Sequence, residues 1–224
     1  EGEGEGEGEG EGEGEGEGEG EGTPQFLTCP PESMLTQDPD PTIGLGGTYS
    51  AENMLLRATE RYFSLSADIV GVGWWGTASD ATDSPCDPTQ EVFTITFYED
   101  DAGSPGAVYV EHELAASVFA TDLVYEQTSP PYSFPVRGYQ AFLPSPCDLA
   151  SGWVRIMHQD DASCRFKWLA SSEGDGYSLK TFTDPFTEED VDYDLALCLV
   201  AAPAEGEGEG EGEGEGEGEG EGEG

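Results

Sequence analysis

Between residues 23 and 204 the chain is a series of short apolar runs rich in Val, Thr, Tyr, Phe and Trp, separated by clusters of Gly, Pro, Asp and Ser. Such runs, bounded by turn residues and almost without helical periodicity, are typical of an antiparallel sandwich or barrel. The pattern predicts an all-β domain, a jelly-roll-like β-sandwich of two antiparallel sheets. The expected strands cover residues 55–65, 69–77, 92–99, 107–114, 122–127, 138–143, 153–158, 164–170, 177–182 and 193–200.

Alternation within two of these runs predicts which side chains face the core. In the third run, Phe93, Ile95 and Phe97 share one side, and the residues between them share the other. In the last run, the tyrosine and the three leucines share one side, and Cys198 lies on the opposite side. We expect each of these strands to bury one face and to expose the other.

Strict Glu-Gly repeats flank this region at residues 1–22 and 205–224. They contain no apolar side chain to bury, and their glutamates repel one another, so we expect disordered, solvated linkers. A polyanionic tail that binds cations is the alternative. Linkers on both sides of a domain at 23–204 indicate a module with neighbouring domains in a longer chain.

The repeats hold 21 of the 49 acidic residues, which leaves 28 acidic against 7 basic side chains in the middle region. This charge excludes nucleic acid and anionic membrane surfaces as expected partners, because both are bound through Lys and Arg. The sequence contains no apolar stretch long enough to span a bilayer.

Five cysteines occur without any Cys-x-x-Cys spacing, which argues against a structural zinc site. Cys86 and Cys147 lie in matching Ser-Pro-Cys-Asp contexts, so we expect a bridge between them. A second bridge is expected between Cys164 and Cys198, with Cys29 as the next candidate partner. Disulfides indicate an extracellular or cell-surface location, whereas five reduced, buried thiols are the alternative.

Several short motifs occur along the middle region: Cys-Pro-Pro at 29–31, Leu-Thr-Gln at 35–37, Trp-Trp-Gly at 74–76, FYEDDAGSPG at 97–106, Gly-Trp-Val at 152–154, GDGYS at 174–178 and YDLALCL at 193–199. In combination they resemble a recurrent β-sandwich module of bacterial secreted and cell-surface multidomain proteins. The resemblance covers nearly all of residues 23–204 and implies a location and an architecture; that family has no assigned activity, so no catalytic residues carry over.

Glu99, Asp100 and Asp101 begin an acidic loop that joins two expected strands and continues through two glycines. Calcium prefers several hard oxygen ligands on a flexible loop, so these three residues are the candidate metal site. The alternative is a solvated acidic turn. The fold itself requires no cofactor. Weaker acidic groups are Asp160 with Asp161, Glu173 with Asp175, and the set Asp190, Asp192 and Asp194.

Trp74 and Trp75 are adjacent in an expected strand, so their indoles must point to opposite sides of the sheet. An outward indole, supported by Tyr98 or Trp153, would form a stacking platform for a sugar ring. The alternative is that the second indole packs under a long loop such as residues 78–90.

Catalytic signals are weak in this sequence. The two histidines, His112 and His158, have no Gly-x-Ser-x-Gly or similar nucleophile context, and both are expected at the surface. We therefore expect a non-enzymatic module of a secreted or cell-surface protein, structural or adhesive, with an extracellular polysaccharide or protein as its ligand. A calcium-supported carbohydrate-binding module is the alternative, and a hydrolase that uses paired carboxylates is the next one.

Overall fold

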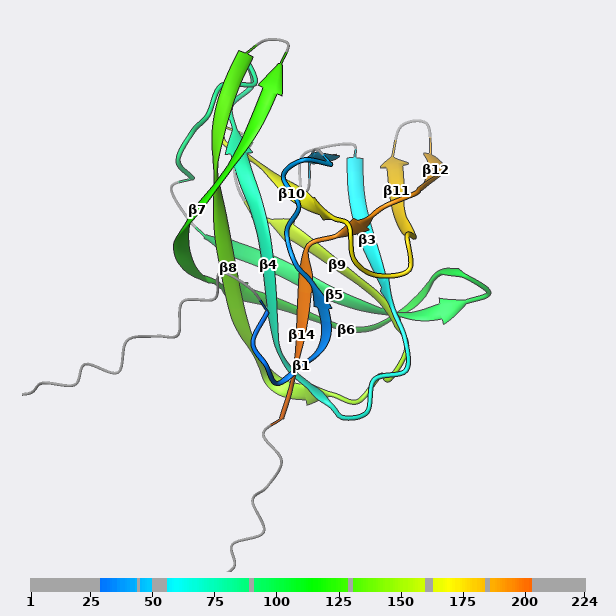
Figure 1. The fold of residues 1–224 in the computed structure, drawn as a ribbon. Coiled ribbons are helices and arrows are strands. Elements are labelled where there is room, and N and C mark those ends of the chain that lie inside the picture. The colour runs from blue at the N-terminus through cyan, green and yellow to red at the C-terminus, as the bar shows by residue number, and fades with distance from the viewer. Residues whose placement is uncertain are drawn as a thin grey trace, which may run out of the picture.

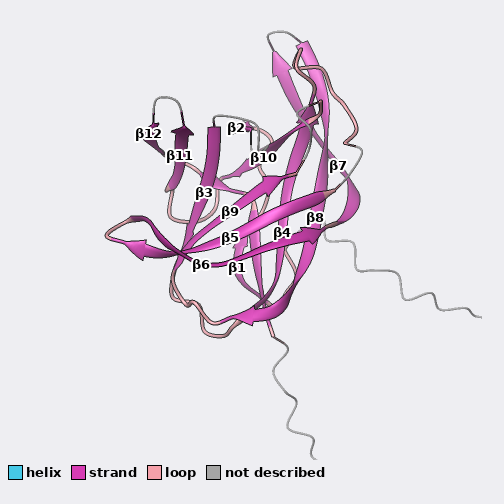
Figure 2. Ribbon diagram, turned by 180° about the vertical axis from the view of Figure 1, so that it is seen from behind, coloured by secondary structure: helices cyan, strands magenta, loops and turns pink. Residues whose placement is uncertain are grey.

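A computed structural model describes residues 29–43, 45–49, 56–88, 91–128, 131–159, 163–183 and 186–202. The Glu-Gly repeats, and with them the linker prediction, lie outside these residues. The described residues form strands and no helix, and two antiparallel sheets pack face to face (Figures 1 and 2). The predicted all-β sandwich is therefore confirmed. None of the described segments is a helix of the length and apolar character that crossing a membrane requires.

The first sheet is organised around β4 (Ile69–Ser79), which pairs along one edge with β8 (Pro131–Cys147). Two strands share the other edge of β4, β14 (Leu197–Ala201) along its first half and β10 (Arg165–Ser171) at its end. The remaining strands extend the sheet outward from these: β1 (Ser33–Gln37) on β14, β2 (Leu45–Tyr49) and β13 (Asp194–Leu195) on β10, and β7 (Ser117–Thr128) on β8. The β7–β8 hairpin projects beyond the other strands (Figure 1).

The second sheet has six strands in the order β12-β11-β3-β9-β5-β6. All its ladders are antiparallel. Only Ala116 separates β6 from β7, so the chain passes from one sheet to the other at that point. The strand bounds are β3 (Leu56–Tyr62), β5 (Val92–Asp101), β6 (Ser104–Ala115), β9 (Gly152–His158), β11 (Ser178–Thr183) and β12 (Phe186–Val191).

Strands β1, β2 and β12 were not expected from the sequence. β2 contains Gly46 and Gly47, and β12 is acidic, so neither has the composition typical of a strand. They form because a neighbouring strand offers an unpaired edge. The run predicted at 193–200 is divided at Ala196 into β13 and β14, which pair with different strands.

The main core lies between the sheets and has aromatic side chains at its centre. Trp74 stacks on Tyr139 at 5.7 Å between ring centroids, and Phe93 meets Trp74 edge-on at 5.0 Å. The predicted core side of the third and last runs is confirmed, because Phe93, Ile95, Phe97, Leu195, Leu197 and Leu199 all belong to this cluster.

Both sheets also bury part of their outer faces, so the prediction that these strands expose one face is wrong. Outside the first sheet, Trp75, Val136, Leu169, Ala196 and Cys198 form a second cluster, which Cys29 and side chains from β7 cover. Outside the second sheet, Tyr98, Trp153 and Leu179 form a third cluster. The third cluster is packed against by Tyr177 of the β10–β11 loop, so side chains outside the two facing layers cover parts of both sheets.

The cysteine pairing differs from the prediction. The bridges join Cys29 to Cys198, the pairing held as the next candidate, and Cys86 to Cys164, while Cys147 is a buried free thiol. Cys147 pairs with Ile69, the first residue of β4. Cys86 N donates a hydrogen bond to the carbonyl oxygen of Ala78, one residue before the end of β4. Eight to nine strand residues separate these points by about 30 Å, far beyond the reach of a disulfide.

The predicted Cys164–Cys198 bridge is wrong for the same reason. Cys198 lies opposite Gly73 of β4, and Cys164 immediately precedes the residue opposite Ser79. Six residues along a strand correspond to about 20 Å. The two matching Ser-Pro-Cys-Asp segments lie at opposite ends of β4, one at the end of β8 and the other beside Ser79.

Candidate functional site

The four aromatic residues predicted as a sugar-stacking platform are buried. Trp74, Trp75 and Trp153 expose at most 1% of their surface, and Tyr98 exposes 8%. Trp75 belongs to the second cluster, against which side chains of β7 pack. The predicted platform is therefore wrong, and the carbohydrate-binding alternative loses the surface that supported it.

The predicted calcium residues Glu99, Asp100 and Asp101 are exposed at the end of β5. Consecutive strand residues point to opposite sides, so the three carboxylates do not converge. Asp100 has a structural role, since its Oδ1 accepts a hydrogen bond from Trp153 Nε1 at 2.9 Å and its Oδ2 accepts one from Gly103 N at 3.3 Å. Positive φ angles at Ala102 and Gly103 make the connection a tight two-residue hairpin turn.

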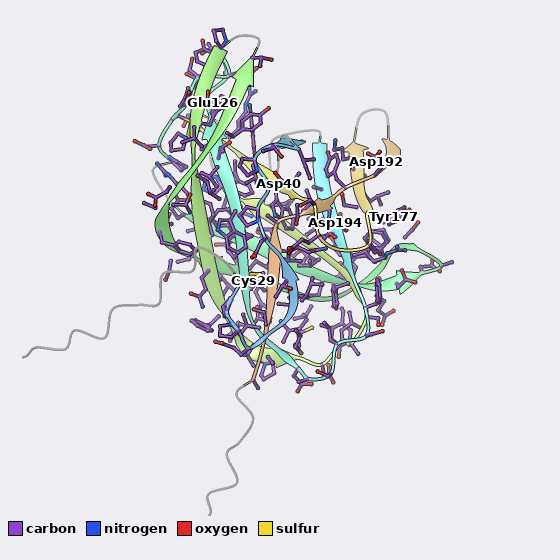
Figure 3. All side chains as sticks on the ribbon, in the orientation of Figure 1. Cys29, Asp40, Glu126, Tyr177, Asp192 and Asp194 are labelled. Atoms are coloured by element: carbon purple, nitrogen blue, oxygen red, sulfur yellow. A yellow bond between two sulfur atoms is a disulfide. The ribbon has the colours of Figure 1, made fainter. Side chains whose placement is uncertain are left out.

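A different carboxylate cluster converges in the described part of the chain. Glu60 of β3, Asp175 of the β10–β11 loop and Asp194 of β13 each place one oxygen so that all three lie within 4.8 Å of one another. Figure 3 shows Asp194 beside Tyr177 and the loop that carries Asp175. Glu60 and Asp194 are buried, whereas Asp175 is exposed.

Backbone N–H groups of the β10–β11 loop surround the Asp194 carboxylate. Asp194 Oδ1 accepts hydrogen bonds from Asp175 N at 3.2 Å and Tyr177 N at 3.3 Å, and Oδ2 accepts one from Gly176 N at 2.8 Å. Gly174 and Gly176 have φ angles of 112° and 73°, which turn these N–H groups toward one point. The Gly-Asp-Gly sequence is thus the local cause of the carboxylate's position.

Glu60 is fully buried at the other side of the cluster. Its Oε1 accepts a hydrogen bond from Gln37 Nε2 at 3.1 Å, and its Oε2 accepts one from Leu195 N at 2.9 Å. Burial raises the pKa of Glu60 well above its ordinary value, and the charge of Asp194 raises it further. Burial also raises the pKa of Asp194. Two adjacent buried carboxyl groups are unfavourable when both are ionised, so either a shared proton or a bound cation is needed to offset their charge.

Arg61 is the basic residue at the solvent side. Its Nε and Nη2 donate to Asp175 Oδ2 at 3.0 and 2.6 Å, and its guanidinium lies 4.3 Å from the ring centre of Tyr177. A groove lined by Gln37, Arg61, Gly174 and Asp175 reaches the cluster from one side of the loop. A second groove reaches Asp194 from the other side, so both sides of the cluster adjoin solvent-accessible space.

The sequence indicated part of this cluster, since Asp175 and Asp194 belong to the weaker acidic groups. Among their neighbours in those groups whose side chains are described, Asp192 is exposed, and Glu173 Oε2 accepts a hydrogen bond from Asp38 N. Glu60 and Gln37 were missed, because they belong to β3 and β1, strands of different sheets that come together only when the two sheets pack. The glycines on both sides of Asp175 were the available signal.

The histidines lie apart from this cluster. His158 is buried, with its ring centroid 4.8 Å from that of Phe93 and its Nε2 3.7 Å from Glu91 Oε2. The expectation of a surface position for His158 is therefore wrong. His112 is half-buried in β6, between the exposed Glu111 and Glu113.

The replacement Gly174→Ala is expected to lower the free energy of unfolding by about 2–5 kcal/mol. The added methyl would sit 2.4 Å from Gln37 Nε2 and 2.5 Å from Asp194 Cγ, at a φ of 112°. Gly176→Ala is the matched control, because its φ is also positive but its methyl would meet nothing within 4 Å. Urea unfolding should show a loss of only about 1–2 kcal/mol for the control; equal losses would mean that the loop does not close on the cluster.

A comparison of the chain with protein-family models, curated proteins and solved structures found no match. The resemblance to a secreted β-sandwich module thus stays a prediction.

Proposed function

We propose that this sandwich is a non-catalytic structural module of a secreted or cell-surface protein, built to transmit tension along a chain without unfolding. The observation that carries the proposal is the disulfide between Cys29 and Cys198. It joins residues 169 positions apart, so nearly the whole described fold lies between its two ends.

The first and last strands support this arrangement. β1 pairs with β14 in register, with Thr36 opposite Cys198 and Gln37 opposite Leu197. The two bridged Cα atoms are 5.5 Å apart, and Cys198 is completely buried. The point where the chain enters the sandwich and the point where it leaves are thus neighbours within one sheet.

A covalent link at this position changes the path of a mechanical load. Tension applied before Cys29 and after Cys198 passes through the sulfur–sulfur bond, because a covalent bond is far stiffer than the hydrogen-bonded sheet. The residues between the two cysteines carry none of it. A module of this kind keeps its shape as a spacer under forces that would unravel an unbridged sandwich.

The proposed location follows from the same chemistry. Disulfides persist in oxidising compartments and are rare in the reducing cytosol. Both bridges here are long-range, with separations of 169 and 78 residues, so each constrains the tertiary fold. A structural role that depends on a disulfide requires an extracellular or cell-surface setting.

Single-molecule stretching of the full chain, held at its two ends, tests this proposal. The oxidised protein is expected to extend only by the residues outside Cys29 and Cys198. The Cys29→Ala variant should add about 300–330 Å in one unfolding event, since 91 of the 169 residues become extensible while Cys86–Cys164 still closes 78. Full reduction should add about 560–610 Å.

The variant Cys86→Ala with Cys164→Ala is the matched control, because it removes a bridge and leaves the load path intact. We expect it to stretch like the oxidised wild type. If the oxidised wild type itself released several hundred ångströms, the bridge would not carry the load, and the proposed role would fail.

A further inference from the structure

We propose that Glu60, Asp175 and Asp194, together with the amide oxygen of Gln37, form a calcium-binding site. This inference does not depend on the mechanical role of the Cys29–Cys198 bridge. The three carboxylate oxygens lie within 4.8 Å of one another. Calcium binds oxygen at 2.3–2.6 Å, so ligands on opposite sides of one ion lie about 4.6–5.2 Å apart. One ion can therefore contact all three carboxylates.

The second observation is the side chain of Gln37. It is 1% exposed, and its Oε1 has no hydrogen-bond partner in the described part of the chain. Its Nε2 donates to Glu60 Oε1, so the amide group itself lies in the cluster. A buried amide oxygen without a partner has lost its hydration without a compensating hydrogen bond, and such an atom calls for an explanation.

A half-turn about the last bond of the Gln37 side chain exchanges its two amide atoms. The nitrogen then leaves Glu60, and the oxygen takes its place facing the carboxylates. A glutamine can thus donate to Glu60 when no cation is present and ligate a cation when one binds. Hydrophobic or basic residues at position 37 would offer only one of these states or neither.

The charge of the cluster matches a divalent ion. Glu60, Asp175 and Asp194 contribute three negative charges when ionised, and Arg61 at Asp175 contributes one positive charge, which leaves −2. Arg61 donates to Asp175 Oδ2, which leaves Asp175 Oδ1 available as a ligand. Tyr177 N donates a hydrogen bond to this Oδ1 and so holds it in position. Bound calcium would balance charges that burial otherwise makes unfavourable.

The donor set favours calcium over other metals. All four atoms are oxygens, which suit hard cations, whereas zinc and copper prefer histidine and cysteine ligands. The ligands come from β1, β3, β13 and a loop with two positive-φ glycines, so the geometry need not be octahedral. Calcium accepts such irregular coordination, while magnesium demands near-ideal octahedra.

Thermal unfolding of the full chain tests the site. About 5 mM calcium should raise the melting temperature by about 2–9 °C over chelator, given an affinity typical of extracellular modules and a domain of this size. Magnesium at the same ionic strength should raise it much less, which separates binding from screening of the acidic surface and the Glu-Gly repeats. Terbium, bound in place of calcium, should show luminescence sensitised by Trp153 and Tyr177.

Two variants decide where the calcium binds. Asp175→Asn removes a ligand charge at an exposed loop position and should reduce the calcium-dependent shift to about a third or less. Asp101→Asn makes the same chemical change in the β5–β6 hairpin and should leave the shift unchanged. Both should unfold cooperatively in chelator, and the sensitised terbium signal should fall only in Asp175→Asn.

The remaining outcomes overturn the proposal. Coincident wild-type melts in calcium, magnesium and chelator would mean that the cluster holds a proton and not a metal. A shift retained in both variants would indicate diffuse binding to the acidic surface. A shift lost only in Asp101→Asn would place the calcium at the hairpin of Glu99, Asp100 and Asp101.

Discussion

Replacing Cys29 and Cys198 together with alanine is expected to lower the free energy of unfolding by about 4.5–5 kcal/mol. The bridge closes a loop of 169 residues, and opening it restores chain entropy to the unfolded state. The lower figure applies if Cys86–Cys164 still closes 78 of those residues. Because domains are stable by only about 5–15 kcal/mol, this variant should be near the limit of folding.

Guanidinium unfolding of the double variant under oxidising conditions measures this loss. Cys147→Ala is the control, because it removes a buried thiol that forms no bridge. That replacement should lower the free energy of unfolding by about 1 kcal/mol, which is typical of removing a small buried apolar group. If the double variant were no less stable than this control, β1 and β14 would hold the two ends together without the disulfide.

The second large effect is expected from Trp75→Ala, at about 3–5 kcal/mol. Trp75 is 1% exposed and packs with Val136, Leu169 and Cys198 on the outer face of the first sheet. Removing the indole leaves a cavity that β7 and the N-terminal segment cannot fill without losing their own pairing. An indole on an open surface would instead cost little when removed.

Urea unfolding of Trp75→Ala beside Phe142→Ala makes this comparison. Phe142 is an aromatic residue of the same sheet, but it is 63% exposed, so its removal should cost about 0.5 kcal/mol or less. Similar small losses of unfolding free energy in both variants would contradict the second cluster and would mean that Trp75 is exposed at the surface. A large loss for Trp75 alone supports the three-cluster arrangement.

Much of the strand content could be predicted from the sequence, because side-chain alternation is a local property. Phe93, Ile95 and Phe97 face the core as their spacing predicts. The predicted exposure of the intervening side was wrong, since Thr94 and Thr96 are buried as well. Alternation distinguishes the two sides of a strand, but a second covering layer can bury either of them.

The candidate site was only partly visible in the sequence. Asp175 stood out between two glycines and Asp194 in an acidic run, yet nothing local connects them to Glu60 or Gln37. Leu195, the residue after Asp194, donates its backbone N–H to the Glu60 carboxylate, and this bond brings Glu60 close to Asp194. Glu60 and Leu195 are 135 residues apart in the sequence. The two residues belong to different sheets, so their contact depends on how the sheets pack, and the sequence pattern does not specify that packing.

The sequence by itself determined the fold class, the positions of most strands and the strongly acidic character of the chain, because each depends on composition and on neighbours within a few residues. Only the tertiary structure decided the disulfide partners, the burial of Trp75 and the convergence of the three carboxylates. Cys86 and Cys147 have the same local sequence, but Cys86 forms a disulfide and Cys147 is a free thiol, since they lie at opposite ends of β4. A disulfide, a buried indole and an ion site all require groups within a few ångströms, and that proximity arises when the sheets assemble.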